Sequence, residues 1–202
     1  MNSPKFYLLL FFINFALIRF SISQDLNLKS PNNEIEVIIS TSNNFSFYVK
    51  LKDNIIIENV DLGLDMSDGR GVGKNSFVKN YSIKLKTRVE SIPIPNKDRE
   101  IKSTYNELRI TLNKNLNIFF RAYNDGIAYR IKDNKNNRKT VEYEKMNLSL
   151  IPGSSTYFPW EESMYSHNER LYNRTKISDL SNGDFCSLPV MFETKYGKVL
   201  FT

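Results

Sequence analysis

The sequence predicts an all-β domain built as an antiparallel sandwich, and three observations support this prediction. The chain of 202 residues contains 14 Phe and 11 Tyr but only three Ala, a balance that favours strands over helices. Apolar and polar residues alternate with a period of two in many short segments. Asn, Asp, Gly and Pro cluster between these segments, as they do in turns. With 41% hydrophobic and 25% charged residues, the chain has a globular composition.

Residues 1–23 have the pattern of a secretory signal peptide. Lys5 precedes an apolar run from Phe6 to Ile18, and Ser21 and Ser23 supply small residues before a cleavage site. The alternative is a membrane anchor, but a run of about 13 residues is shorter than a bilayer requires. We therefore expect a secreted or periplasmic protein whose mature chain, residues 24–202, is one domain and is not in a membrane after cleavage.

The first third of the mature chain predicts strands in pairs. A strand pair is expected between residues 26 and 41, turning at Pro31, and residues 45–51 alternate as a half-buried strand does. Short strands are expected at 55–57 and 62–64. The glycine-rich residues 68–73 lack the helix and the Lys-Ser/Thr pair of a phosphate-binding loop, so they are expected to form a turn.

The middle of the chain predicts a run of hairpins. Residues 82–89 form a strand with a basic outer face, and Pro93 and Pro95 make residues 91–100 a loop. Three consecutive strands follow at 107–112, 117–123 and 127–131. The Asn-Asp-Gly turn at 124–126 is a strong hairpin signal. Residues 141–150 and 156–160 complete this series.

The last forty residues change character. Residues 161–183 show no alternation, with one helical turn expected over 176–180, and a final hairpin is expected from 187–193 and 197–201. The apolar strand at Val199 to Thr202 has no cap or polar tail. We therefore expect a chain truncated within a larger protein, with a sandwich that is incomplete at its C-terminal edge.

The counts of reactive residues exclude several classes of site. A single cysteine, Cys186, excludes a disulfide framework, and a single histidine, His167, excludes a two-histidine metal site. Removal of Lys5 and Arg19 with the signal peptide lowers the net charge from +6 to +4. Because no basic block is interleaved with aromatic residues, we expect no nucleic-acid partner. Arg121 is expected to face solvent or to pair with Glu107.

Two segments resemble a known family. The stretch from Tyr105 to Leu108 and the stretch from Phe120 to Arg130 are similar to the N-terminal domain of glycoside hydrolase family 97, which comprises secreted α-glucosidases and α-galactosidases. The resemblance implies an all-β antiparallel super-sandwich similar to galactose mutarotase. It also implies a following catalytic barrel as the domain's partner, a saccharide substrate, and no catalytic residue in this chain. The fragment alone is then expected to be inactive.

The same resemblance implies calcium as the cofactor of the full-length enzyme. The spacing from Glu169 through Tyr172 to Leu180 matches the family, which makes Glu169 a calcium ligand together with residues of the barrel. Calcium binds hard oxygen ligands, commonly six to eight of them. Glu161 and Glu162 are alternative ligands if the register differs, and a solvated surface carboxylate is the remaining interpretation of Glu169.

Candidates for substrate binding are aromatic. Trp160, Tyr165 and Tyr172 are the sugar-facing candidates, although Trp160 is also typical of a sandwich core. The family commonly has Trp-Gly-Glu before the Tyr105 motif, whereas this chain has Pro-Asn-Lys at 95–97. Two further hypotheses stay open, namely a stand-alone carbohydrate-binding module and a structural sandwich that docks through residues 161–180. His167 as a mutarotase-like acid or base is a third interpretation, against a surface histidine.

Overall fold

The computed structural model describes residues 25–202 apart from 43, 74–75, 92, 95–96 and 136–137. The expected signal peptide and part of the loop around Pro95 lie outside the described residues. Within the described part of the chain, no helix is long and apolar enough to cross a membrane. The helical elements there are two single 3-10 turns, η1 (Asn113–Asn115) and η2 (Ile177–Asp179). The second of these confirms the expected helical turn.

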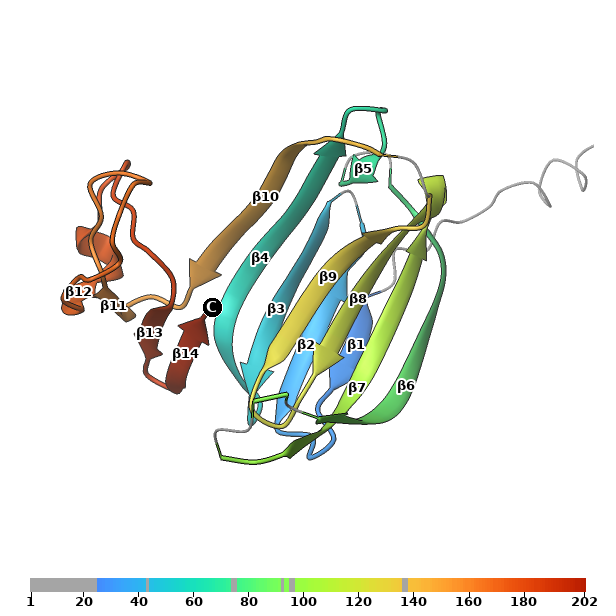
Figure 1. Cartoon of the computed structure of the whole chain (residues 1–202), viewed down its shortest axis with the longest axis horizontal. Coiled ribbons are helices and arrows are strands. Elements are labelled where there is room, and N and C mark those ends of the chain that lie inside the picture. Colours follow the sequence, from blue (N-terminus) through green and yellow to red (C-terminus); the bar gives the residue numbers. More distant parts are fainter. Residues whose placement is uncertain (1–24, 43, 74–75, 92, 95–96, 136–137) are drawn as a thin grey trace, which may run out of the picture.

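In this described part of the chain, fourteen antiparallel strands form three sheets, and Figure 1 shows their arrangement. The first sheet has the order β1 (Leu26–Lys29), β2 (Ile35–Ser40), β3 (Phe45–Leu51), β4 (Asn54–Met66) and β10 (Val141–Leu150), with β5 (Gly71–Val72) on β4. The second sheet has the order β6 (Val78–Ser91), β7 (Glu100–Leu112), β8 (Leu116–Ala122) and β9 (Ile127–Asp133). The third has the order β12 (Asn173–Lys176), β11 (Ser155–Phe158), β13 (Val190–Thr194) and β14 (Gly197–Phe201).

The first two sheets pack face to face around the hydrophobic core, which confirms the expected sandwich. Strand β3 buries alternate residues, as its sequence predicts. Its Phe47 ring meets Phe120 of β8 edge-on at 5.3 Å between centroids and lies 6.2 Å from Tyr129 of β9. Strand β1 contacts β7 and β8. Strands β1 to β3 therefore lie opposite β7 to β9.

The two sheets are offset, so strands overhang on both sides of the sandwich. Strand β6 lies beyond the cover of β1, and its residues from Lys79 to Ser91 are all exposed. Ile83 and Leu85 pair with Leu108 and Asn106 on the core side of the sheet, yet they remain 47% and 66% exposed. On the other side, β4 and β10 extend past β9 (Figure 1).

Several strands are longer than the sequence predicts. The expected strands at 55–57 and 62–64 are one continuous strand, β4, whose pairing with β3 and β10 contains register shifts. Strands β6 and β7 form a ladder of thirteen paired positions that begins well before residue 107. Strand β12 lies in the segment expected to be irregular, and it pairs with β11.

Two charge clusters link strands of the sandwich, one between the first and second sheets and one within the second sheet. Arg70 donates both terminal nitrogens to Asp133 at 2.6 Å and its Nε to Asp68 at 2.7 Å. Glu107 accepts from Arg121 at 2.8 Å and from Lys86 at 2.5 Å, which confirms the ion pair as the environment of Arg121. Burial raises the pKa of Glu107, but these two cations more than offset it and the pKa is lowered.

Candidate functional site

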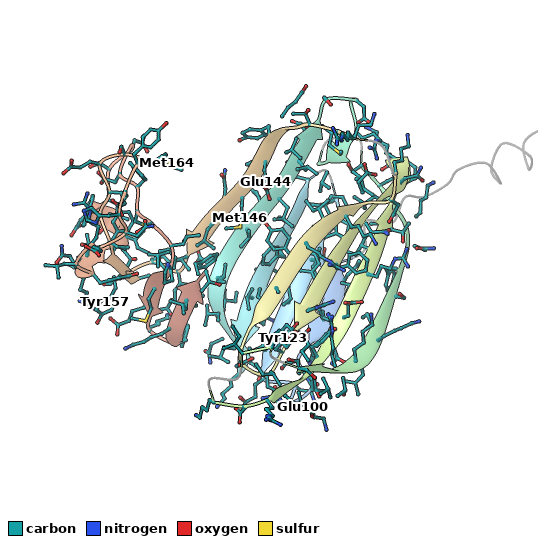
Figure 2. The ribbon with its side chains drawn as sticks, viewed as in Figure 1. Glu100, Tyr123, Glu144, Met146, Tyr157 and Met164 are labelled. Carbon is teal, nitrogen blue, oxygen red and sulfur yellow. The ribbon has the colours of Figure 1, made fainter. Side chains whose placement is uncertain are left out.

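The predicted site residues lie on an irregular segment at the end of the third sheet. Trp160 forms an isolated bridge with Cys186, and the chain from residue 161 to residue 172 then has no regular secondary structure. It returns to the sheet at Asn173 in β12. Figure 2 shows Met164 of this segment pointing away from the sandwich. Most side chains of this segment are exposed, whereas Glu161 at its start is buried.

A pocket of about 480 Å³ lies along this segment. Its lining consists of Trp160, Glu161, Glu162, Glu169, Arg170, Leu171 and Asn173. Three of the predicted acidic residues and one predicted aromatic residue are therefore brought together, although they lie up to nine positions apart in the sequence. Pockets of this size accommodate small organic ligands.

An ion pair between Glu161 and Arg170 forms one wall of the pocket. Arg170 Nε donates to Glu161 Oε2 at 3.0 Å, and the Glu161 side chain is only 2% exposed. The Glu161 backbone N–H donates to the Phe185 carbonyl at 3.1 Å. Glu161 thus fixes one end of the segment to the loop before β13, and Arg170 fixes the other end to Glu161.

Among the described residues, no hydrogen-bond donor reaches the second carboxylate oxygen, Glu161 Oε1. The nearby Ser166 hydroxyl lowers the pKa of Glu161, burial raises it, and Arg170 lowers it again, so the net shift is downward. Glu161 is therefore ionised at neutral pH.

Glu169 lies in the same pocket but points into solvent. Its side chain is 87% exposed, and its backbone N–H donates to Nδ1 of His167 at 3.1 Å. Glu162 lines the pocket as well. No three acidic, histidine or cysteine side chains in the described part of the chain are grouped closely enough to hold a metal ion. These residues alone therefore do not fit a calcium site.

The three aromatic candidates have different environments. Trp160 is half-buried, lies 4.7 Å from the Phe158 ring in an edge-on contact, and lines the pocket. Tyr165 is 97% exposed and does not line the pocket. Tyr172 donates its hydroxyl to the Pro189 carbonyl at 3.0 Å. Of the three, Trp160 is the one placed to contact a ligand in the pocket.

The remaining reactive residues have ordinary surroundings. The His167 side chain is 62% exposed, and its nearest acidic neighbour is Glu169 at 3.9 Å. Cys186 is half-buried, and burial raises the pKa of its thiol, so the thiol is protonated at neutral pH.

Sequence reasoning missed Arg170 as a site residue. Nothing in the local pattern distinguishes Arg170 from the other cations of this Lys- and Arg-rich chain. The pair of acidic residues directly after Trp160 was the one available signal. If one of these carboxylates is buried, it requires a nearby cation or several hydrogen-bond donors, and Arg170 is such a cation.

Comparisons with known proteins agree with this architecture. The family model "Glycosyl-hydrolase 97 N-terminal" matches residues 28–202. A retaining alpha-galactosidase of Bacteroides thetaiotaomicron is 24% identical over 190 residues, covering 89% of this chain and 28% of the relative. The chain therefore spans less than a third of that relative's length.

Solved structures share the fold. A β-arabinopyranosidase aligns with a TM-score of 0.74 and 21% identity, over 88% of this chain and 31% of that chain. A glycoside hydrolase family 97 enzyme from Pseudoalteromonas sp. strain K8, solved with panose and also with acarbose, aligns with a TM-score of 0.68 and 17% identity, over 84% of this chain and 27% of that chain. Since the family model matches most of its length, the chain belongs to the N-terminal family of the glycoside hydrolase 97 enzymes.

Proposed function

We propose that this chain is the docking domain of a secreted, calcium-assisted α-glycosidase of the α-glucosidase or α-galactosidase class. Family membership and the names of the relatives support this substrate class. The domain would serve the enzyme by contacting the catalytic barrel and by bringing one carboxylate to its mouth. Residues 1–23 would direct export.

The observation that carries the proposal is the apolar exposure around Glu169. Met164, Tyr165 and Leu171 are 88%, 97% and 84% exposed, and they lie within five residues of Glu169. Three large apolar side chains in water on one irregular segment are unfavourable in an isolated domain and typical of a contact surface. Residues 161–180 are therefore the proposed contact with the barrel, with Glu169 at its centre.

Calcium would require ligands from outside the described residues. Glu169 supplies one exposed carboxylate, Glu162 lies in the same pocket, and Glu161 is already engaged by Arg170. Calcium needs several more oxygen ligands than this. The proposal therefore assigns Glu169 as one ligand of a shared site and assigns no calcium site to the chain alone.

The test begins with the coding sequence that contains this chain. A reading frame that continues into a catalytic barrel supports the proposal, and a stop codon after Thr202 contradicts it. In the longer product, Glu169→Gln should weaken calcium binding about a hundredfold by calorimetry, a typical effect of losing one site group. Glu58→Gln, at an exposed position of β4, is the matched control and should leave the calcium affinity unchanged.

A second candidate function is a stand-alone carbohydrate-binding module, favoured by the pocket beside Trp160. Trp160 is the single tryptophan of the chain, so its fluorescence reports on this pocket directly. If the module hypothesis holds, panose or an α-galactoside should change that fluorescence in the mature chain, and Arg170→Leu should abolish the change. Tyr165→Ala, outside the pocket, is the control. No change with either sugar would exclude the module.

A further inference from the structure

The outer face of the second sheet carries an excess of positive charge. This face is the side of β6 to β9 that is turned away from the first sheet, and it faces the viewer in Figure 1. Directly opposite residues of paired strands share a face, so four neighbouring rows of paired residues can be assigned to it. Six cations in these rows, which we call the basic face, are Lys84, Lys86, Arg109, Arg121, Arg130 and Lys132.

A single carboxylate lies in these four rows, and it compensates two of the six cations. Glu107 accepts from Lys86 and from Arg121, and its side chain is 6% exposed. The other four cations are exposed, and none of them forms an ion pair with a described residue. The basic face therefore keeps uncompensated charge from three of the four strands of the sheet.

The outer face of the first sheet is balanced in comparison. Lys29 and Lys50 lie 3.7 and 3.9 Å from the carboxylate of Glu36, which is on the strand between them. Lys145 lies 3.3 Å from the carboxylate of Asp61. Because like charges on neighbouring strands destabilise a sheet, the excess on the second sheet has a cost that an anionic partner would remove.

Aromatic rings hold the arginines of the basic face in place. The guanidinium carbons of Arg109 and Arg130 lie 5.8 and 5.1 Å from the centre of the Phe119 ring. Such contacts position a guanidinium but do not neutralise it. An arginine held in this way loses less conformational freedom on binding, and its N–H groups can donate in pairs to a carboxylate or a sulfate. The basic face is therefore suited to anionic groups of these two kinds.

The same contacts disfavour a nucleic acid as the partner. Single strands bind by stacking their bases on open aromatic rings. The Phe119 ring is half-buried and carries two guanidinium groups, and Tyr105, with Arg121 at 4.6 Å from its ring centre, is 3% exposed. These rings are therefore not open to bases.

A lipid surface is also disfavoured, because peripheral binding to a membrane uses exposed apolar side chains. The exposed uncharged positions in these four rows are Asn80, Ser82 and Ala128, which are small or polar. Side chains of this kind suit a hydrated polymer whose hydroxyl groups form hydrogen bonds. The charge and the surroundings of the basic face together favour an acidic polysaccharide.

We propose that the basic face binds an acidic polysaccharide, with Arg109 and Arg130 donating to its carboxylate or sulfate groups. This polymer is not the substrate, and its site is on a different sheet from the pocket beside Trp160. The binding would hold a secreted glycosidase on an anionic matrix. That role rests on the proposed function, whereas the recognition of anionic groups rests on the basic face.

Carboxymethylcellulose is the anionic probe, and hydroxyethylcellulose of similar length is the neutral control. Both have a β-linked backbone, so a site for α-glycosides does not contribute. Calorimetry, with the protein at the length that its gene encodes, should show binding of carboxymethylcellulose alone. The affinity should fall at least about tenfold between roughly 50 and 200 mM salt, because binding releases counterions. Binding of neither polymer, or equal binding of both, would overturn the proposal.

Two double variants with the same loss of charge locate the site. Arg109→Gln with Arg130→Gln should weaken binding of carboxymethylcellulose at least about tenfold. Lys50→Gln with Lys145→Gln removes two charges from the outer face of the first sheet and is the matched control, with an expected change below about twofold. Equal weakening by both pairs would assign the binding to net charge and overturn the site.

A second pair of substitutions guards against loss of folding. Lys84→Gln with Lys132→Gln changes two exposed side chains, so it should leave the circular dichroism spectrum unchanged and still weaken binding. Single-stranded DNA and vesicles of anionic lipid are the competing probes. Tighter binding of either one than of carboxymethylcellulose at the same salt concentration would overturn the choice of a polysaccharide.

The results separate this proposal from the proposed function. Absence of binding in a product that contains a catalytic barrel would overturn the polysaccharide site and leave the docking role intact. Binding in a product that ends at Thr202 would contradict the docking role and support the polysaccharide site.

Discussion

Arg70 connects three regions that lie far apart in the sequence. Its guanidinium binds Asp68 in its own turn, Asp133 at the end of β9, and the Lys114 carbonyl in η1 at 3.2 Å. The side chain is 7% exposed, and the two carboxylates are about a fifth exposed. Charge-assisted, bidentate contacts of this kind are among the stronger polar interactions in proteins.

Arg70→Met should therefore destabilise residues 24–202 by about 3 kcal/mol, because it leaves two partly buried carboxylates without their cation. Urea denaturation at pH 7 measures the change. Arg88→Met is the matched control. Arg88 is 61% exposed and, among the described residues, pairs with exposed Glu90, so the loss there should be below about 1 kcal/mol. Equal losses in the two variants would contradict a structural role for the Arg70 cluster.

The same cluster predicts a pH dependence of stability. The hydrogen bonds that Asp133 accepts from Arg70 lower the pKa of Asp133 from 3.8 to about 2. Because the folded state holds the proton less tightly than the unfolded state, the contribution of Asp133 is complete above pH 3.8 and is lost as the pH falls towards 2. Thermal unfolding at pH 7, 4 and 2.5 should show this loss. Asp133→Asn should unfold with a shallower decline, and an unchanged decline would contradict the assignment.

Sequence reasoning captured residue roles only where partners are adjacent or lie on paired strands. The Arg121–Glu107 pair was predictable because both residues lie on neighbouring predicted strands. The partners of Arg70 and of Glu161 were not, since they depend on where loops return to the sheets. Glu169 was placed by resemblance to a family, and the structure puts it in one pocket with Glu161 and Glu162.

At the scale of elements, part of the glycine-rich segment 68–73, which the sequence predicts as a turn, is a short strand paired with β4. Gly71 belongs to β5 and pairs with Asp65 of β4. A Cβ atom there would lie 2.0 Å from the Leu64 carbonyl oxygen, which is backbone and cannot move aside. The residue is therefore required for the close approach of two strands, and no bound phosphate is needed to explain it.

Gly71→Ala should therefore lower stability by about 2–3 kcal/mol through steric strain. Gly126→Ala is the control, because a Cβ atom there meets nothing within 4 Å. Thermal unfolding of both variants gives the comparison. If Gly71→Ala and Gly126→Ala unfold at the same temperature, the close approach of β5 to β4 is wrong.

The extent of the strands was only partly predictable. Alternation located β3 because one of its faces is buried in the core and the other is partly exposed. Strand β4 was not predicted as one continuous strand, because Glu58 and Asn59 interrupt its alternation of apolar and polar residues. In the structure, register shifts in the pairing with β3 and β10 accommodate this interruption. Strands β6 and β7 extend beyond the core, where burial no longer imposes a pattern.

At the scale of the whole molecule, residues 24–202 expressed alone should have no glycosidase activity. Hydrolysis of a glycosidic bond uses two carboxyl groups on opposite sides of that bond. In the pocket, Glu161 is held by Arg170, and Glu162 and Glu169 lie on one exposed segment. Nitrophenyl α-galactoside and α-glucoside should release no nitrophenol above background. Release that Glu162→Gln or Glu169→Gln abolishes would contradict this expectation.

The sandwich as a class was predictable from the sequence, whereas the arrangement of its three sheets was not. Composition and alternation specify strands and their burial. They do not specify that β10 returns to β4, or that the first and second sheets are offset by whole strands. Those features depend on pairings between distant segments, which a single sequence does not reveal.

The pairing of β4 with β10 has a consequence for how the chain folds during synthesis. Asp61 and Lys145, which meet across this pair, are 84 residues apart. Strand β4 can pair with β3 as soon as both have left the ribosome, but its other edge stays free until β10 emerges. All four strands of the second sheet are made in that interval. Such long-range pairing slows folding, so a chaperone that shields the β4 edge would raise the yield of native protein.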